Sequence, residues 1–309
     1  MQALIGVILP VFLVIGAGYL ATRRGLFPDS GVDGLMTFTQ GFAIPCLIFR
    51  AISTLDLSQD FDGGMLVSFY GGATLSAFTA LMLARHVFAR AWPDAVAIAF
   101  IALFSNSVLL GLPIMERAFG AAAMAGNYAI VALHAPFCYA IGITAMEVAR
   151  AGSGGLAGLV PRVLRAMLAN ALVIAILLGF AVNLSGLTLP VPVTDAVDLM
   201  VRAALPAALF GLGGVLTRYR PEGDMRTILA VGACSLILHP AATYALALML
   251  SVGEAGLRSA VVTAAMAPGV NAYVFANMYG VAKRVAASTV LLATGACVVT
   301  AWGWLALLP

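Results

Sequence analysis

Long apolar runs separated by short polar connections are the dominant pattern of this sequence. A window of about 20 mostly apolar residues predicts a helix long enough to cross a lipid bilayer. Ten such windows occur, near residues 3–22, 34–53, 62–84, 94–118, 123–149, 163–184, 194–217, 225–250, 258–280 and 284–307. The pattern therefore predicts an all-α membrane protein with ten transmembrane helices.

The longest connection between these windows divides them into two groups of five. It covers residues 151–162 and is rich in Gly and Ser. We expect a first five-helix repeat over residues 1–150 and a second five-helix repeat over residues 163–309. Because each group holds an odd number of spans, the two repeats would have opposite orientations in the membrane.

Matching residues recur in the two groups at a nearly constant separation. The pairs are Gly18-Tyr19 with Gly179-Phe180 and Pro45 with Pro206, both 161 residues apart, Gly25 with Gly186, and Phe119-Gly120 with Tyr279-Gly280 at 160 residues. Self-similarity at a fixed period is typical of repeat architectures. These matches favour an inverted-topology repeat.

Basic residues lie mostly in the connections that follow the odd-numbered windows. These are 12 of the 16 Lys and Arg residues: Arg23, Arg24, Arg85, Arg90, Arg150, Arg162, Arg165, Arg218, Arg220, Arg226, Lys283 and Arg284. The opposite connections hold Arg117 and Arg258 together with Asp56, Asp60, Asp62, Asp195 and Asp198. Since basic loops stay on the cytoplasmic side, we expect both termini outside the cell membrane.

The composition excludes several classes of protein. Hydrophobic residues make up 62% of the chain and charged residues only 9%, with a mean hydropathy of +1.05, whereas soluble domains carry about 25% charged residues. The net charge of +3 and the scattered arginines do not indicate nucleic-acid binding. The four cysteines lie singly in apolar runs without metal-ligand spacing, so no metal or cofactor is predicted.

Two of the windows are interrupted by proline, one in each half of the chain. The first reads Asn106-Ser-Val-Leu-Leu-Gly-Leu-Pro113 and the second reads Pro268-Gly-Val-Asn271. Lipid cannot satisfy the backbone groups that a break frees, so broken helices line a protected or wet cavity. A matched pair of broken helices indicates the binding site of a secondary transporter.

The half-helix after each break would direct its free N–H groups, and a partial positive charge, toward an anion. The candidate substrate-binding residues are Ser105, Asn106, Ser107, Gly111, Pro113, Asn127, Tyr128, Pro268, Gly269 and Asn271. The alternative is that the prolines only kink the helices, while the Ser and Asn side chains bond the loosened backbone.

Ionisable residues within the windows add further candidates. No Asp or Glu lies well inside a span, which argues against a cation site built from carboxylates. Arg50 and Arg202 lie in the outer half of the membrane, where they either attract an organic anion or reach the interface or Asp198. His134 and His239, near mid-span, are candidate proton carriers or neutral side chains bonded to backbone carbonyls.

The strings around the two breaks resemble the auxin efflux carrier family. The strings are Asn106…Gly111-Leu-Pro113…Phe119-Gly120 and Ala267-Pro268…Asn271-Ala-Tyr-Val-Phe-Ala276…Tyr279-Gly280, and the resemblance covers the whole chain. This family includes plant auxin exporters and bacterial carriers of malonate-like organic acids. The chain is similar to a short bacterial-type member, since it has no long cytoplasmic loop.

The resemblance implies a fold like that of sodium/proton antiporters, with broken helices 4 and 9 crossing at the membrane centre. It also implies a scaffold of spans 1, 2, 6 and 7, a moving core of the other six spans, elevator-type motion and a homodimer.

We therefore expect a secondary transporter of a small organic anion, such as a dicarboxylate or an auxin-like acid, in the inner membrane, and no enzymatic activity. A sodium-coupled, bile-acid-like symporter is the main alternative and would need an oxygen-rich cation site. A membrane-embedded enzyme would need a catalytic cluster of His, Asp or Glu. A sensor or channel would need a signalling domain or a polar-lined span.

Overall fold

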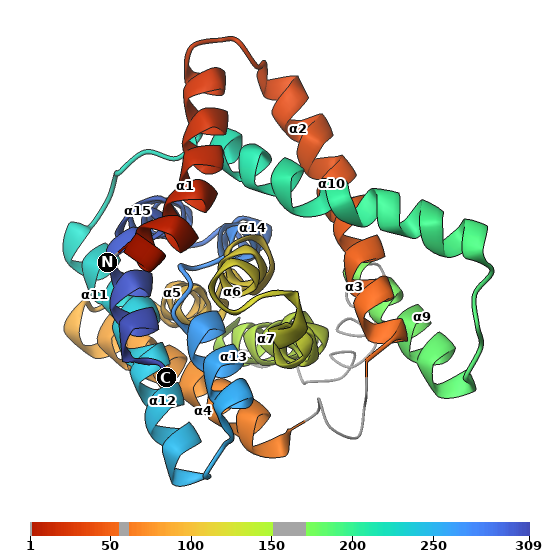
Figure 1. Cartoon of the computed structure of the whole chain (residues 1–309). Helices are drawn as coiled ribbons and strands as arrows, with labels where there is room; N and C mark the ends of the chain where they lie inside the picture. Colours follow the sequence, from red (N-terminus) through yellow and green to blue (C-terminus); the bar gives the residue numbers. More distant parts are fainter. Residues whose placement is uncertain (1, 56–61, 151–170) are drawn as a thin grey trace. The chain divides into compact units, whose positions relative to one another are not determined.

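The computed structural model describes residues 2–55, 62–150 and 171–309 (Figure 1). In these ranges the chain is helical, and no strand occurs apart from one isolated bridge. The all-α prediction is therefore confirmed. The predicted loop 151–162 and the side chains of Asp56, Asp60, Arg162 and Arg165 lie outside the described residues.

Seven helical spans in the described ranges are long and apolar enough to cross a membrane. They are Ile5–Arg23, Asp29–Ser53, Gly63–Val87, Ala125–Arg150, Val191–Leu216, Met225–Met249 and Lys283–Leu307, and they coincide with seven of the ten predicted windows. The windows 94–118 and 258–280 are each divided into two helices. The window 163–184 is described only from α9, Ala171–Ser185.

The chain forms two compact units, each made from both halves of the sequence. The first unit comprises Met1–Phe61 and Leu164–Arg218, and the second unit comprises Asp62–Val163 and Tyr219–Pro309. The first unit thus holds predicted spans 1, 2, 6 and 7, and the second holds the other six. This grouping coincides with the division of spans that the family resemblance implies.

Two close helix pairs organise the first unit. Its helices are α1 (Gln2–Arg23), α2 (Asp29–Phe38), α3 (Ile44–Ser53), α9 (Ala171–Ser185) and α10 (Val191–Leu216). Helix α1 crosses and packs against α10, and α3 packs against α9 (Figure 1). Small residues at such contacts let the helix backbones approach.

The same glycine–phenylalanine contact occurs in both helix pairs. In one pair the first half of the chain supplies the glycine, and in the other pair the second half does. A Cβ at Gly18 would lie 2.0 Å from the carbonyl oxygen of Phe210, and a Cβ at Gly179 would lie 3.2 Å from that of Phe49. Gly179 follows Gly18 by 161 residues, and Phe210 follows Phe49 by the same 161 residues. The separation of 161 residues between matching sequence positions therefore also relates two helix contacts in the first unit.

The second unit surrounds a helix that is buried over most of its length. Its helices are α4 (Gly63–Met82), α5 (Trp92–Leu103), α6 (Leu112–Phe119), α7 (Ala125–Arg150), α11 (Met225–Ala233), α12 (His239–Met249), α13 (Glu254–Ala264), α14 (Val270–Tyr279) and α15 (Lys283–Leu307). Every residue of α5 from Ala95 onward is buried, as expected for a helix that is apolar on all sides. Neighbouring α4, α7, α14 and α15 cover it.

Repeated local features occur in the second unit at a separation of 162 residues. Asp62 caps α4 by accepting from two backbone N–H groups, at 2.7 and 3.3 Å, and Asp224 caps α11 in the same way at 3.1 and 3.4 Å. Ala89 and Ser251 follow the ends of equivalent helical spans, and both have a positive φ, of 51° and 53°. A positive φ is uncommon for residues other than glycine.

Three prolines are preceded by a π-helical turn that ends two residues earlier. The turns are Thr39–Ala43 before Pro45, Ser107–Gly111 before Pro113 and Cys234–Leu238 before Pro240. In each, the residue before the proline donates to the carbonyl five residues back, at Thr39, Ser107 or Cys234. Proline lacks an N–H and crowds the carbonyl four residues back, so a wider turn keeps the helix continuous.

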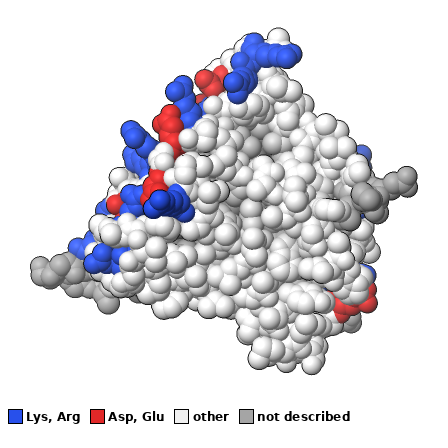
Figure 2. All heavy atoms as spheres, turned by 90° about the vertical axis from the view of Figure 1, so that its left-hand side faces the viewer, with Lys and Arg blue, Asp and Glu red and all other residues white. Residues whose placement is uncertain are grey.

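One face of the protein surface is almost free of charge. Figure 2 shows Lys, Arg, Asp and Glu side chains along the margin of this face and uncharged atoms across it. Within each unit, large apolar side chains are exposed: Leu13 of the first unit is 61% exposed, and Phe78 and Leu229 of the second are 57% and 63% exposed. Exposed apolar surface on this scale indicates contact with lipid or with another protein.

Candidate functional site

Two broken helices in the second unit pair with each other through their backbones. Helix α5 ends at Leu103, and Ser105 forms an antiparallel bridge with Pro268, which lies between α13 and α14. The Asn106 N–H donates to the Ala267 carbonyl at 2.8 Å, and the Gly269 N–H donates to the Phe104 carbonyl at 2.9 Å. Each break thus satisfies backbone groups that the other break frees.

The two broken helices run antiparallel on either side of this bridge. At one end, the Ala282 N–H just after α14 donates to the Asp94 carboxylate at the start of α5, at 2.9 Å. At the other end, the Arg258 guanidinium in α13 lies 4.5 Å from the ring centroid of Phe119, the last residue of α6. The α5–α6 and α13–α14 pairs therefore cross at the bridge.

Asn106 begins the first half-helix and has one side-chain atom without a partner. Its Oδ1 accepts from the Leu109 N–H at 3.2 Å, which caps the turn that follows. Its Nδ2 is buried and has no hydrogen-bond partner in the described part of the chain. The residue is only 5% exposed, and a buried donor left unpaired is costly, so this amide is a candidate ligand group.

Pro113 does not mark the break, although the sequence pattern predicted that a proline interrupts this window. The break lies at Phe104–Asn106, and Pro113 falls in the first turn of α6, after the π-helical turn. That turn absorbs the missing N–H without interrupting the helix. Gly111 lies closer to the crossing, since a Cβ there would be 3.6 Å from Met266 and 3.9 Å from Thr263.

The second half-helix begins without a side-chain cap. Gly269 is the N-cap residue of α14, and it lies against the first break because a Cβ there would be 3.6 Å from the Asn106 Cα. The first N–H groups of a helix lack intrahelical acceptors. Asn271 lies in this first turn and is partly buried. An anion placed at this turn would meet free N–H groups and the positive end of the helix.

Asn127 belongs to a polar cluster beside the crossing. Its Nδ2 donates to the Thr263 hydroxyl at 2.9 Å, and that hydroxyl donates to the Ser259 carbonyl at 2.7 Å. The Asn127 Oδ1 and the Ser259 hydroxyl are buried without partners in the described ranges. Hydrophobic patterning did not single out Thr263 and Ser259 as site residues, although their spacing of four places them on one helix face. Tyr128 follows Asn127 and is partly buried.

The two mid-span histidines both pack against Phe69. His134 has its Nε2 3.1 Å from the Ser105 carbonyl oxygen of the bridge, and its ring packs 4.7 Å from that of Phe104. The Phe69 ring lies 5.6 Å from His134 and 5.2 Å from His239. His134 therefore contacts the crossing directly, whereas His239 is fully buried and contacts Phe69.

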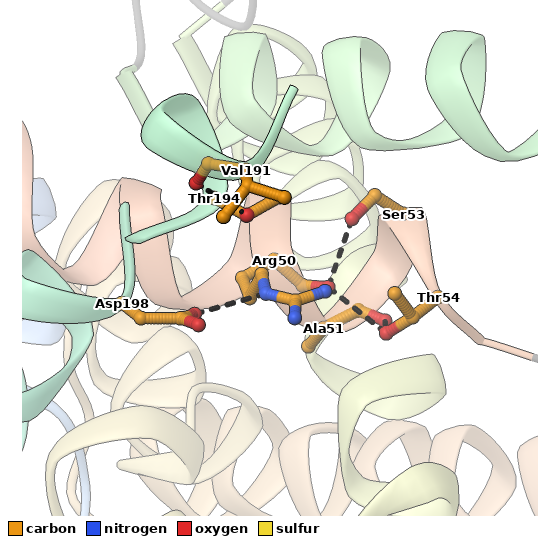
Figure 3. A network of polar contacts seen from close by, with 7 residues as sticks. All are labelled: Arg50, Ala51, Ser53, Thr54, Val191, Thr194 and Asp198. Carbon is orange, nitrogen blue, oxygen red and sulfur yellow. Dashed lines mark hydrogen bonds and ion pairs between the residues drawn. The ribbon is translucent and has the colours of Figure 1, made fainter. Parts of the chain in front are cut away.

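Arg50 and Arg202 belong to the first unit. The Arg50 Nε donates to the Asp198 carboxylate at 2.9 Å, and its backbone carbonyl accepts from Ser53 and Thr54 (Figure 3). About a third of each charged side chain remains exposed, at 35% and 38%. The pairing with Asp198 that the sequence suggested is thus present. Arg202 is exposed one helical turn after Asp198.

No group of three or more His, Cys, Asp or Glu side chains in the described ranges could hold a metal ion. The site consists instead of neutral amides, hydroxyls and helix termini in a buried setting. Such groups can bind an anion or a polar small molecule.

Comparisons with known proteins agree over the whole chain. A family model described as "Membrane transport protein" matches residues 3–154 and 156–305. A protein of Rhizobium meliloti (strain 1021) named "Putative malonate transporter" is 27% identical over 320 residues. That alignment covers 100% of this chain and 97% of the relative.

Proposed function

Since the chain belongs to this family of membrane transport proteins, the auxin efflux carrier family that its motifs resemble, we propose that its substrate is a small dicarboxylate of the malonate type. The protein is a multi-pass membrane transporter of organic anions and not an enzyme. The observation that carries the proposal is the buried, unpaired Nδ2 of Asn106 beside the uncapped start of α14.

The substrate carboxylate would bind where the two breaks meet. The Asn106 Nδ2 would donate one hydrogen bond, and the first N–H groups of α14 would donate others. Asn271 would add its side chain from the same turn, and Ser105, Ser107 and Asn127 would provide further polar contacts. Hydrogen bonds to a charged group are stronger than those between neutral groups, and the buried setting strengthens them further.

The transport cycle would use an inverted repeat of ten spans. This proposal is supported by the exchanged contacts of Gly18 and Gly179 and by the equivalent caps at Asp62 and Asp224. The first unit would be a dimerising scaffold, and the second unit would carry the substrate across the inner membrane in an elevator-type motion. Both termini would lie outside. Each unit has its own close-packed core, as a rigid-body motion requires.

Sodium coupling is a second candidate because of one observation. The Asn127 Oδ1 and the Ser259 hydroxyl are unpaired oxygens beside the crossing, and sodium binds such oxygens. No carboxylate of the described residues takes part in that cluster's hydrogen bonds. A site of neutral oxygens alone would hold a monovalent cation weakly, so we favour transport without sodium.

The test is uptake by the purified protein in liposomes. Labelled malonate should enter in a saturable manner, and an auxin-like acid should serve as a competitor. Imposed sodium and pH gradients separate the two coupling candidates. Asn277, an exposed residue of α14, supplies the control variant Asn277→Ala, which should transport like the wild type. Absence of malonate uptake under every gradient would refute the proposed substrate class.

A further inference from the structure

Each half-helix that leaves the crossing ends in an aromatic residue followed by a glycine with positive φ. Helix α6 ends at Phe119 before Gly120, with a φ of 86°, and α14 ends at Tyr279 before Gly280, with a φ of 74°. An arginine guanidinium lies over each ring, Arg258 at 4.5 Å from the centroid of Phe119 and Arg150 at 4.8 Å from that of Tyr279. Both distances are within the range of cation–π attraction.

Arg150 holds the end of α14 by two contacts. It comes from the last turn of α7, and its Nη2 also donates to the Tyr279 backbone carbonyl. This carbonyl lies in the last turn of α14, where the helix dipole presents partial negative charge. The guanidinium therefore binds both the ring and the helix terminus.

Arg258 contacts the end of α6, at the end of the crossed helices that lies opposite to Arg150. It lies in α13 beside Glu254, with which it forms an ion pair, and its Nε donates to the Pro309 carbonyl at 3.0 Å. These partners fix the guanidinium over Phe119. The two arginines thus act on different half-helices and at opposite ends of the second unit.

We propose that Arg150 and Arg258 are positioning residues for the substrate site, a proposal that rests on the proposed function. Each arginine holds the far end of one half-helix, and the near ends carry Asn106 and Asn271. The first half-helix comprises the five-residue turn Ser107–Gly111 and the eight residues of α6, and the second comprises the ten residues of α14. The two are therefore about 15–20 Å long, and each transmits a displacement along its axis as a rigid rod. Releasing the far end would therefore displace the ligand groups at the crossing.

The first test measures substrate affinity in the full-length protein. Arg150→Met and Arg258→Met should each weaken malonate binding about three- to tenfold, the size expected from losing a cation–π contact. Arg150→Lys should restore most of the affinity because the cation remains. Arg226→Met is the control, since this exposed arginine lies at neither half-helix end. Isothermal titration on purified protein gives the dissociation constants.

A double-mutant cycle separates positioning from general stability. Tyr279→Leu should weaken binding like Arg150→Met, and the double variant should be little weaker than either single variant. The same relation should hold for Phe119→Leu with Arg258→Met. A lower melting temperature with wild-type malonate affinity in both Arg→Met variants would mean that the arginines only stabilise the fold, and it would overturn the proposal.

A second readout needs no substrate. In a Cys46→Ala background, a cysteine introduced at Asn271 should react with a maleimide at least about threefold faster when Arg150→Met is added, because the loosened α14 exposes it more often. If the wild type binds no malonate, the proposed function fails, and this labelling rate alone decides the positioning role. An unchanged rate would then refute the role of Arg150.

Discussion

The backbone N–H of Asn106 donates to the carbonyl of Ala267 at 2.8 Å, so a backbone group freed by one helix break is satisfied by the other break. This bond bears on the alternative that the polar side chains at the breaks serve only the backbone. The Asn106 Oδ1 does cap the turn at Leu109, but its Nδ2 has no partner in the described part of the chain. The Oδ1 of this amide has a structural role, and its Nδ2 is available to a ligand.

A substitution at Asn106 can separate the capping role of Oδ1 from the proposed ligand-binding role of Nδ2. Asn106→Asp keeps the acceptor that caps Leu109 but removes the donor and places a negative charge against the anion. A hydrogen bond to a charged group contributes roughly 1.5–3 kcal/mol, which corresponds to about tenfold or more in affinity. We expect Asn106→Asp to fold and to bind malonate at least about tenfold more weakly, as measured by isothermal titration.

Asn271→Ala should weaken binding to a similar degree, while the exposed control Asn277→Ala should not. Wild-type affinity in Asn106→Asp and Asn271→Ala together would place the substrate site elsewhere.

The close helix pair α1–α10 gives a prediction about stability. Gly18→Ala would place a methyl group 2.0 Å from the Phe210 carbonyl oxygen, so the two helices must separate. Overpacking of this kind costs typically about 1–3 kcal/mol. The matched control is Gly16→Ala on the same helix, where a Cβ would meet nothing within 4 Å. The melting temperature in detergent should fall for Gly18→Ala and not for Gly16→Ala, and equal values would contradict the packing argument.

The cap of α11 makes stability depend on pH. The pKa of Asp224 is lowered from 3.8, chiefly because the Thr227 hydroxyl donates to the carboxylate, with further hydrogen bonds from backbone N–H groups and Arg90. A lowered folded-state pKa means that this stabilisation is complete above about pH 4. It is lost as the pH falls through the still lower folded-state value.

We therefore expect the melting temperature of the wild type to decrease on acidification below about pH 4. Asp224→Asn retains a good cap residue but has no charge to titrate. The difference in melting temperature between wild type and variant should be largest above pH 4 and should shrink toward acid. A difference that is independent of pH would exclude Asp224 as a source of the acid sensitivity.

Periodicity and proline spacing predicted much of this fold because apolar windows report directly on helices that cross a membrane. Seven windows became continuous helical spans, and the windows holding Asn106 and Asn271 became the two broken ones. The exact position of a break was harder to predict. Pro113 suggested a break that the π-helical turn before it avoids, and nothing in the local sequence distinguishes a wider turn from an interruption.

The site was only partly predictable for a different reason. Residues on one broken helix are apparent from the sequence, but their partners lie far along the chain. Asn127 bonds Thr263 across 136 residues, and Arg150 bonds Tyr279 across 129 residues. Such pairs depend on how helices pack, and hydrophobic patterning does not specify that.

Membrane orientation can be tested by cysteine labelling from outside the cell. The distribution of basic residues predicts that Asp195 lies on the outer side and Arg220 on the cytoplasmic side. Both side chains are exposed, so reagent access alone should decide the result. An impermeant maleimide should label Asp195→Cys and not Arg220→Cys in intact cells, and both should react after permeabilisation. The opposite pattern would invert the proposed topology.

The mid-span histidines give the final prediction, which concerns coupling. His134 places its Nε2 3.1 Å from the Ser105 carbonyl of the bridge, so a change of charge there would act directly on the crossing. His134→Gln retains an amide donor for that carbonyl and removes the titratable ring. His239→Gln removes the other titratable ring, which packs against Phe69. If protons drive transport, the double variant should still insert and bind malonate, but its uptake rate should no longer depend on pH.

His86→Gln is the control, because His86 is exposed and lies outside this aromatic cluster. Uptake by the double variant that follows the wild-type pH profile would eliminate both histidines as proton carriers.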